Sequence, residues 1–403
     1  MPGTGRTVGN KTVLISGAGV AGPTLAYWLL ESGFQPVVVE RASKFREAGY
    51  IVDFWGVGYD VAEKMELIPA LRRNGYVNNR AVFVRADGAE RSSFGGDALR
   101  RSMGDRFLSI QRGNLARLIY DTVCDRIETR FGDEIAVLEQ RTDRVEVGFR
   151  GGKVCSFDCV VGADGLHSKA RAEMSIPQTA IERYLGYYAA VFVTRGYSRR
   201  SDRTYLSFAS PGRQISRFAL RDDETGFLFV FRKRDRDLEF ALDLPAQKLA
   251  LLQAFETEKW EEWPEIREHL EACDDLYFDA VAQVECPVWS TGRVALVGDA
   301  AYCPSLLAGE GSALAMAGAY ILAREMAGAA GDYSAAFESY ERRFRPFIEQ
   351  KQKSARAFAS SFAPATSVGL IIRDIVLKLT EIPLVADFLM RRFVMDNFSL
   401  PEY

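Results

Sequence analysis

Histidine is scarce in this sequence: the 403-residue chain contains only His167 and His269. With so few histidines and no clustered carboxylates, neither a catalytic metal site nor a Ser-His-Asp hydrolase is expected. An enzyme of this composition would depend on a bound cofactor for its chemistry.

Paired cysteines are also lacking. The six cysteines, at positions 124, 155, 159, 273, 286 and 303, show neither the C-x-x-C spacing of a zinc site nor a dense disulfide framework. We therefore expect buried free thiols in a reducing, cytoplasmic setting.

No charge of one sign dominates, since the formal net charge is −3. The basic clusters at 199–200 and 232–236 are diluted by aspartates, so no nucleic-acid-binding surface is expected. The proportions of 48% hydrophobic and 26% charged residues are typical of a soluble globular protein.

Hydrophobic runs suited to cross a membrane are absent as well. Val13–Leu30 carries no charge, but three glycines and a proline interrupt it, and no convincing signal-peptide cleavage site follows. Thr366–Phe393 is apolar but broken by charged residues and Pro383, which predicts packing or surface helices instead of a span.

The most informative stretch that is present is Lys11–Arg41, which has the pattern of a strand, a glycine turn, a helix and a second strand. Its turn contains Gly17, Gly19 and Gly22 in the G-x-G-x-x-G spacing. The first glycine permits a tight turn, the second lets a pyrophosphate approach the backbone, and the third lets helix and strand pack closely. This pattern predicts a dinucleotide-binding βαβ unit, with an ordinary tight turn as the alternative.

The second strand of this unit ends in an acid. Glu40 lies 18 residues beyond Gly22, near the spacing of a carboxylate that accepts hydrogen bonds from ribose hydroxyls. Arg41 follows, but the acid favours an unphosphorylated ribose.

Two later loops repeat the arrangement of a buried strand followed by an acid. Val154–Val161 leads into Gly162-Ala163-Asp164-Gly165, and Arg293–Val297 leads into Gly298-Asp299. Ligands of open α/β sheets bind at the carboxyl ends of the strands, so both carboxylates are expected there. The alternatives are a plain Asp-Gly turn for the first loop and, for Leu314–Leu322 after the second, a helix that only packs on the sheet.

With three such loops in order, the chain resembles the single-component FAD-dependent aromatic monooxygenases of the para-hydroxybenzoate hydroxylase fold. It is most similar to the branch that contains tetracycline-modifying and polyketide-tailoring hydroxylases. The resemblance runs from about Lys11 to about Tyr340. The chain departs from the family pattern at four positions, with Tyr302 for a histidine, Ala313 for an asparagine, Gly318 for an aspartate, and a single, shifted Pro304 at the ring.

The resemblance implies a FAD site that includes two arginines. Arg112 matches an arginine that contacts FAD, with a surface salt bridge as the alternative, and Arg46 matches one beside the flavin. The amino end of the helix after Gly309 and Gly311 would face the flavin's pyrimidine oxygen. The residues expected to bind FAD are Gly17, Gly19, Val20, Ala21, Gly22, Glu40, Arg41, Arg46, Arg112, Asp164, Gly298, Asp299, Pro304, Gly309, Gly311 and Ser312.

The expected fold class is α/β: a Rossmann-like FAD-binding domain with an inserted antiparallel β-sheet substrate domain and C-terminal helices. The expected division assigns residues 1–75, 101–176 and 288–340 to the FAD-binding domain. It assigns a hairpin at 76–100 and the aromatic-rich stretch 177–287 to the substrate domain, and 341–403 to the helical region.

By resemblance, the chain would hydroxylate a hydrophobic aromatic or polyketide-like small molecule with NAD(P)H and O2, through a flavin hydroperoxide. No second dinucleotide fingerprint is present, so NAD(P)H would bind transiently. No catalytic side chain is identified. Candidates are Arg46, Asp53, Arg213 and Arg217, and candidates for the substrate wall are Phe54, Phe192, Phe208, Arg217 and Phe229; core packing or a solvated face is the alternative for each.

Two other functions stay open, a flavin oxidase or dehydrogenase without external NAD(P)H and a flavin-binding protein without turnover. The protein is expected to be a monomer or homodimer without a metal.

Overall fold

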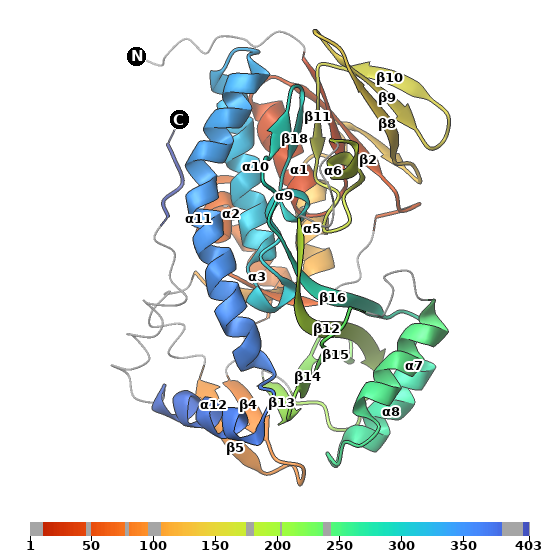
Figure 1. The fold of residues 1–403 in the computed structure, drawn as a ribbon, viewed down its shortest axis with the longest axis vertical. Helices are drawn as coiled ribbons and strands as arrows, with labels where there is room; N and C mark the ends of the chain where they lie inside the picture. The colour runs from red at the N-terminus through yellow and green to blue at the C-terminus, as the bar shows by residue number, and fades with distance from the viewer. Residues whose placement is uncertain are drawn as a thin grey trace.

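The computed structural model of the protein describes residues 11–45, 50–76, 80–95, 106–174, 181–201, 204–236, 243–380 and 398–402. A six-stranded sheet forms the upper half of the molecule in Figure 1 and a seven-stranded sheet the lower half. The expected combination of a parallel sheet, an antiparallel sheet and C-terminal helices is confirmed. The exact domain boundaries stay a prediction.

The six-stranded sheet has the order β17-β18-β11-β1-β2-β7, and all neighbours except β17 and β18 are parallel. Its central strands are buried on both faces, which explains their runs of valine, leucine and isoleucine. The strands are β1 (Thr12–Ser16), β2 (Gln35–Glu40), β7 (Glu128–Phe131), β11 (Cys159–Gly162), β17 (Ser290–Thr291) and β18 (Val294–Leu296).

Helices and two small sheets complete the upper half, which is the half predicted to bind FAD and is called the flavin half below. The helices are α1 (Ala21–Glu31), α2 (Gly56–Lys64), α3 (Ile68–Asn74), α5 (Arg112–Asp121), α6 (Lys169–Glu173), α9 (Asp299–Tyr302), the 3-10 turn η2 (Leu306–Ala308) and α10 (Gly311–Gly328). The small sheets consist of β3 (Ile51–Phe54) with β6 (Leu108–Gln111), and of β8 (Ile135–Gln140), β9 (Val145–Phe149) and β10 (Val154–Phe157). The sheet β8–β10 lies on the opposite side of the half from α10 (Figure 1).

The seven-stranded sheet has the order β16-β12-β15-β14-β13-β4-β5. Its pairs are antiparallel except β13 with β4, so the expected hairpin near residues 76–100 joins the sheet through one parallel pair. The strands are β4 (Arg80–Val84), β5 (Glu90–Gly95), β12 (Glu182–Arg195), β13 (Thr204–Ser210), β14 (Arg213–Ala219), β15 (Glu224–Arg232) and β16 (Tyr277–Val284).

One face of this sheet, the helical face, packs against α7 (Leu244–Phe255) and α8 (Trp263–Ala272). The sequence predicted only one helix here, near Leu249–Glu258. The opposite face packs against η2 and the end of α11 (Tyr333–Phe362) through a small apolar cluster. Helix α12 (Ser367–Leu379) lies at β5 and β13, and the rest of the expected C-terminal helix pair lies outside the described residues.

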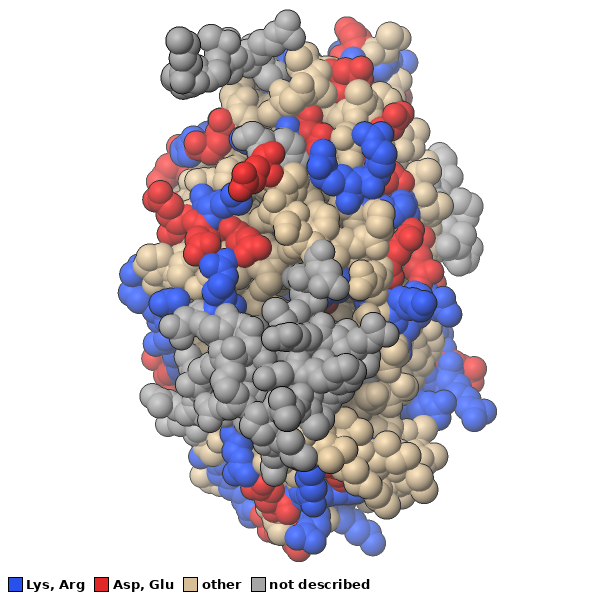
Figure 2. Space-filling view, turned by 90° about the vertical axis from the view of Figure 1, so that its left-hand side faces the viewer, with Lys and Arg blue, Asp and Glu red and all other residues tan. Residues whose placement is uncertain are grey.

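Helix α11 runs alongside α10 and continues to the lower sheet (Figure 1). Phe337, Tyr340 and Phe344 belong to the core of the flavin half, whereas Ala359 and Ala363 at its far end contact the seven-stranded sheet. Among the helices of the described residues, none has a hydrophobic stretch of the length that a bilayer span requires. Basic and acidic side chains are interspersed on the face of the molecule shown in Figure 2.

Candidate functional site

Three loops meet at one edge of the six-stranded sheet. The last residues of β1, β11 and β18 are in register, because Ser16 pairs with Gly162 and Gly162 with Leu296. The loops that follow therefore begin side by side and line one pocket together with β16 and α10. Its lining residues are Gly19, Val20, Ala21, Tyr50, Val52, Arg112, Ala163, Gly165, Leu166, Tyr277, Ala280, Ala282, Asp299, Cys303, Ser305, Leu306, Gly309, Gly311, Ser312 and Ala315.

The first loop is the glycine turn, and it needs its glycines for different reasons. Gly17 has φ +111°, and a Cβ there would lie 2.4 Å from the carbonyl oxygen of Ala163. A Cβ at Gly22 would lie 2.0 Å from the carbonyl oxygen of Gly17. Gly19 is different, because the nearest atom to its Cβ position is Nη2 of Arg112 at 3.9 Å. Gly17 and Gly22 thus pack the turn, and Gly19 leaves an open approach to its backbone.

Glu40 is fixed at the end of β2 by the same turn. Its carboxylate accepts hydrogen bonds from the backbone N–H groups of Ala18 (2.9 Å) and Ala42 (2.8 Å). The remaining lone pairs of a carboxylate can still accept from a hydroxyl group. Arg41 is exposed and does not line the pocket, and Arg46 lies outside the described residues.

Arg112 begins α5 and lines the pocket beside Gly19. Its guanidinium lies 6.0 Å from the ring centroid of Tyr50, and the charges of Tyr50 and Asp299 raise its pKa. Burial raises the pKa of Tyr50 to about 12. Among the described residues, none accepts a hydrogen bond from the Arg112 guanidinium, so the predicted alternative of a surface salt bridge is not what the structure shows. A cation held in this way is suited to an anionic ligand.

Asp164, in the second loop, follows the carboxyl end of β11 and is hydrogen-bonded to neighbouring groups. Its carboxylate accepts hydrogen bonds from the hydroxyls of Ser16 and Ser168 and from the N–H groups of Lys169 and Ala170. These bonds fix the loop and the start of α6. The pocket is lined by the neighbours of Asp164, so the loop reaches the pocket mainly through backbone.

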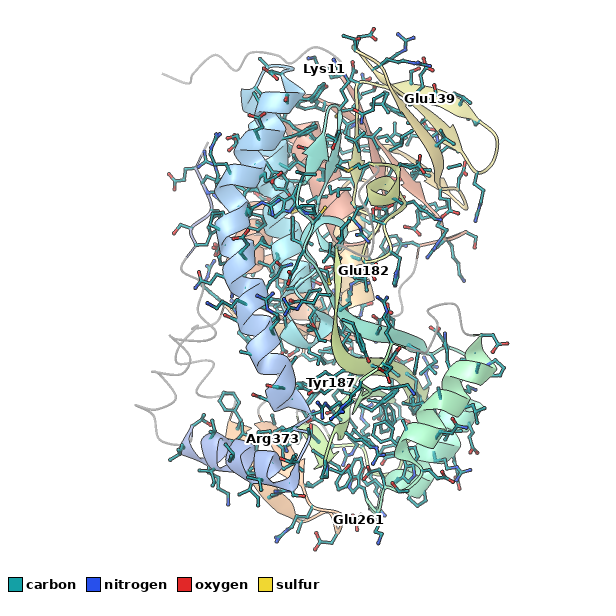
Figure 3. The ribbon with its side chains drawn as sticks, in the orientation of Figure 1. Lys11, Glu139, Glu182, Tyr187, Glu261 and Arg373 are labelled. Carbon is teal, nitrogen blue, oxygen red and sulfur yellow. The ribbon has the colours of Figure 1, made fainter. Side chains whose placement is uncertain are left out.

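Arg171 joins the second loop to the third. Its guanidinium is 1% exposed and donates to the carbonyl oxygens of Ala300 (2.9 Å) and Leu166 (2.6 Å). It also lies 3.4 Å from Glu182, which Figure 3 places where β12 enters the upper half of the molecule. The nearby His167 lies 3.2 Å from the carboxylate of Asp279 on β16, so the two sheets are connected through this loop.

The third loop carries Asp299 and ends at α10. Gly298 has φ +67° and packs against Ala21 of the first loop, with 3.1 Å between the two Cβ positions. Beyond Gly309, Gly311 and Ser312 present the amino end of α10 to the pocket. Pro304 is the exception: its carbonyl accepts from Gln283 (2.8 Å), and the pocket wall at this point is Cys303, Ser305 and Leu306.

Two of the departures from the family pattern compensate each other. A Cβ at Gly318 would lie 1.9 Å from the hydroxyl of Tyr302, so the glycine in the middle of α10 makes room for this tyrosine. The Tyr302 hydroxyl lies 3.0 Å from that of Tyr340, and Trp289 packs on the Tyr302 ring. Tyr302 is therefore a core residue behind the third loop and does not line the pocket.

The three sheet phenylalanines predicted for the substrate wall do not line the pocket. Phe192, Phe208 and Phe229 all lie on the helical face and belong to the core with α7 and α8. The ring of Phe208 stacks on Trp260 at 5.4 Å, and that of Phe229 meets Phe255 at 5.2 Å. Side chains alternate between the faces of a sheet, and the sequence does not say which face turns toward the cofactor.

The other predicted wall and catalytic residues also occupy core or surface positions. Phe54 is fully buried in the flavin half. Arg217 is buried on the helical face and makes two hydrogen bonds to Glu262 (2.7 and 3.1 Å). Arg213 is partly exposed and pairs with Glu258 at 3.2 Å. None of these three residues lines the pocket.

The opposite face of the sheet carries polar side chains instead. The hydroxyls of Ser207 and Ser216 lie 2.8 Å apart, and the amide of Gln214 donates to Ser216 (3.1 Å). Gln214 in turn accepts from Arg373 of α12, which Figure 3 shows pointing toward the strands. Burial, and to a smaller extent the charge of Asp53, raises the pKa of Tyr205 on this face.

Asp53 of β3 is the predicted catalytic candidate that lies nearest the seven-stranded sheet's polar face among the described residues. Its carboxylate accepts a hydrogen bond from Ser109 (2.5 Å), and desolvation by the surrounding protein raises its pKa. The charge of Asp53 also contributes to the raised pKa of Tyr205 on the neighbouring sheet.

Sequence reasoning missed several residues of the pocket wall, among them Tyr50, Tyr277, Cys303, Ser305 and Leu306. Tyr50 and Tyr277 face each other with ring centroids 5.7 Å apart, although they are 227 positions apart in the chain. Burial raises the pKa of Tyr277. No local pattern marks either tyrosine as a pocket residue.

Comparison with known proteins agrees with this geometry. The family model described as a FAD binding domain matches residues 10–355. A flavin-dependent monooxygenase of an unknown prokaryotic organism is 32% identical over 97% of this chain and 98% of its own length. The crystal structure of tetracycline destructase Tet(55) is similar with a TM-score of 0.82 and 31% identity, covering 98% of this chain and 99% of that one.

A more distant structure shows the same fold. Klebsiella pneumoniae HpxO complexed with FAD and uric acid has a TM-score of 0.76 at 21% identity, covering 96% of this chain and 98% of that one. The chain therefore belongs to the FAD-dependent monooxygenases built on this FAD-binding domain.

Proposed function

We propose that this monooxygenase hydroxylates a hydrophobic aromatic or polyketide-like small molecule, using NAD(P)H and O2. The observation that carries the proposal is the convergence of three in-register loops on one pocket that also contacts β16 of the second sheet. Similarity to a tetracycline destructase supports a polycyclic substrate. We also propose that the protein is a cytoplasmic monomer or homodimer.

The residues around the pocket fit FAD. Glu40 would accept from the ribose, the backbone at Gly19 and the guanidinium of Arg112 would bind phosphate oxygens, and the amino end of α10 would face the ring. Asp299 would bind the polar chain between phosphate and ring. When bound, the flavin would supply the redox chemistry, taking hydride from NAD(P)H and activating dioxygen.

The protein itself would orient the substrate and exclude water. Tyr50, Tyr277 and Leu306 provide apolar and aromatic surface at the pocket. Asp53 and Tyr205 are the titratable groups that we assign to the substrate side, where a carboxylate of raised pKa can take a proton from a phenolic hydroxyl.

The proposal is tested with purified protein and a panel of polycyclic phenols. We expect FAD to be retained, NADPH oxidation to accompany substrate turnover, and product to contain one atom from labelled dioxygen. Reduction of the flavin by substrate alone under nitrogen would support a dehydrogenase instead. Bound FAD without NADPH consumption on any ligand would support a binding protein.

A variant tests the placement of the cofactor. Asp299→Ala should lower FAD retention about tenfold or more. Asp143→Ala is the control and should not change it, because Asp143 is exposed between β8 and β9 and does not line the pocket. Full FAD occupancy in Asp299→Ala would contradict the assignment of the third loop.

A further inference from the structure

A buried ion pair lies directly behind the amino end of α10. Nζ of Lys351 on α11 is 2.7 Å from Oε1 of Glu310, and the two side chains are only 10% and 15% exposed. Glu310 is the N-cap residue of α10 and precedes Gly311, which lines the pocket. The pair therefore connects the long helix α11 to the end of the pocket assigned to the flavin ring.

The charges at this point oppose one another. The amino end of a helix carries about half of a positive charge, which would stabilise negative charge on a reduced flavin. A carboxylate at the N-cap contributes a full negative charge, so alone it would reverse the sign of the local potential. The positive charge of Lys351 cancels the negative charge of the Glu310 carboxylate, so the net charge at this end of α10 is again positive. Because both side chains are shielded from water, solvent and salt screen this charge only weakly.

The position of Lys351 is set by a second contact on α11. Lys351 approaches from α11, where its Nζ also lies over the ring of Phe347, 5.6 Å from the centroid. Phe347 belongs to the core of the flavin half, so the position of Lys351 is fixed by packing as well as by charge.

We propose that Lys351 is a positioning residue that sets the reduction potential of the bound flavin by neutralising Glu310. This inference rests on the proposed FAD site. Lys351 does not line the pocket and acts through Glu310 and α10, so it is distinct from the residues that would contact the cofactor.

The test is the midpoint potential of the FAD-loaded full-length protein, together with the affinity for oxidised FAD. Lys351→Met should weaken binding of reduced FAD about tenfold relative to oxidised FAD, which lowers the potential of the two-electron couple by about 30 mV. Glu310→Gln in the Lys351→Met background should restore the potential, and Lys351→Arg should keep it close to that of the wild type.

Lys353→Met is the matched control, because it removes the same charge from the same helix at an exposed position and should leave the potential unchanged. An unchanged potential in Lys351→Met would overturn the inference, as would a shift that persists in the double variant. Equal loss of affinity for both redox forms would show a purely structural role. Failure of the wild-type protein to bind FAD would instead contradict the proposed function.

Discussion

The two faces of the seven-stranded sheet differ in chemistry and in what they contact. The helical face is aromatic and closes a core with α7 and α8. The opposite face carries Ser207, Gln214 and Ser216, contacts η2 of the third loop through Leu307, and is within electrostatic reach of Asp53. The aromatic side chains of this sheet therefore stabilise its core, and the polar strand positions lie on the other face.

Phe229→Ala should have the largest effect if the helical face is only a core. Phe229 is fully buried, so its truncation leaves a cavity and should cost about 3–5 kcal/mol of unfolding free energy. Urea denaturation measures this loss. Substrate affinity of the remaining folded protein should not change, and a selective loss of affinity with normal stability would return Phe229 to the substrate wall.

Arg217→Met should lower the free energy of unfolding by about 3 kcal/mol, because the carboxylate of Glu262 would remain buried without its cation. Adding Glu262→Gln should recover most of this stability, since the neutral amide can still accept from Tyr197, whose hydroxyl now lies 2.6 Å from the carboxylate. Denaturation of both variants provides the comparison. If Arg217 binds substrate, the double variant would be stable but unable to bind it.

Gly318→Ala extends the comparison to the flavin half, where a glycine packs against the ring of Tyr302. The added methyl group would overlap the Tyr302 hydroxyl, and we expect a cost of about 1–3 kcal/mol despite the better helix propensity of alanine. Tyr302→Phe removes the overlapping atom and should rescue much of the loss. Thermal unfolding of the two single variants and the double variant would show whether these positions are coupled.

Ser216→Ala, on the opposite face, should cost only about 1 kcal/mol, because one hydroxyl is lost from a small hydrogen-bonded network. The change in the KM for substrate, converted to a free energy, should be larger than the loss of unfolding free energy. Ser156→Ala, at an exposed position of β10, is the control. A loss of stability as large as that of Phe229→Ala would remove the distinction between the two faces.

Asp53→Asn should produce the smallest and most specific change, a loss of pH dependence. Desolvation by the surrounding protein raises the pKa of Asp53 in the folded state, so as pH rises through the ordinary carboxyl range the unfolded chain loses this proton first. The free energy of unfolding therefore falls with pH until the raised pKa is passed, and then this contribution stays constant. Asp53→Asn should lack that fall in denaturation profiles taken from acid to neutral pH. Parallel profiles for the two proteins would contradict the enclosed position of Asp53.

The flavin half was largely predictable from sequence because its motifs are local. β1 has the predicted bounds, and Gly19, Arg112, Asp299 and Gly311 do line one pocket. The roles of Asp164 and Pro304 were not predictable, since they depend on which nearby groups capture a carboxylate or a carbonyl.

The strands of the seven-stranded sheet were predictable from sequence, but not which face of the sheet is covered by helices. Alternation tells which residues share a side, so Phe229 and Ile215 belong together, but only the packing of α7 and α8 decides that this side is closed. The second helix, α8, has Pro264 in its first turn, and a proline can mark either the start or the end of a helix. Tyr277 was missed because its partner Tyr50 is distant in sequence.

The 30-residue helix α11 has a mechanical consequence. The helix is about 45 Å long and spans both halves of the molecule. Its aromatic residues pack in the core of the flavin half, and the alanines at its far end pack against the seven-stranded sheet. Pro346 removes one backbone hydrogen bond from the helical ladder, but Phe344 and Phe347 on either side of it pack in the core of the flavin half. A motion between the two halves would therefore have to bend the turns of α11 that follow Ile348.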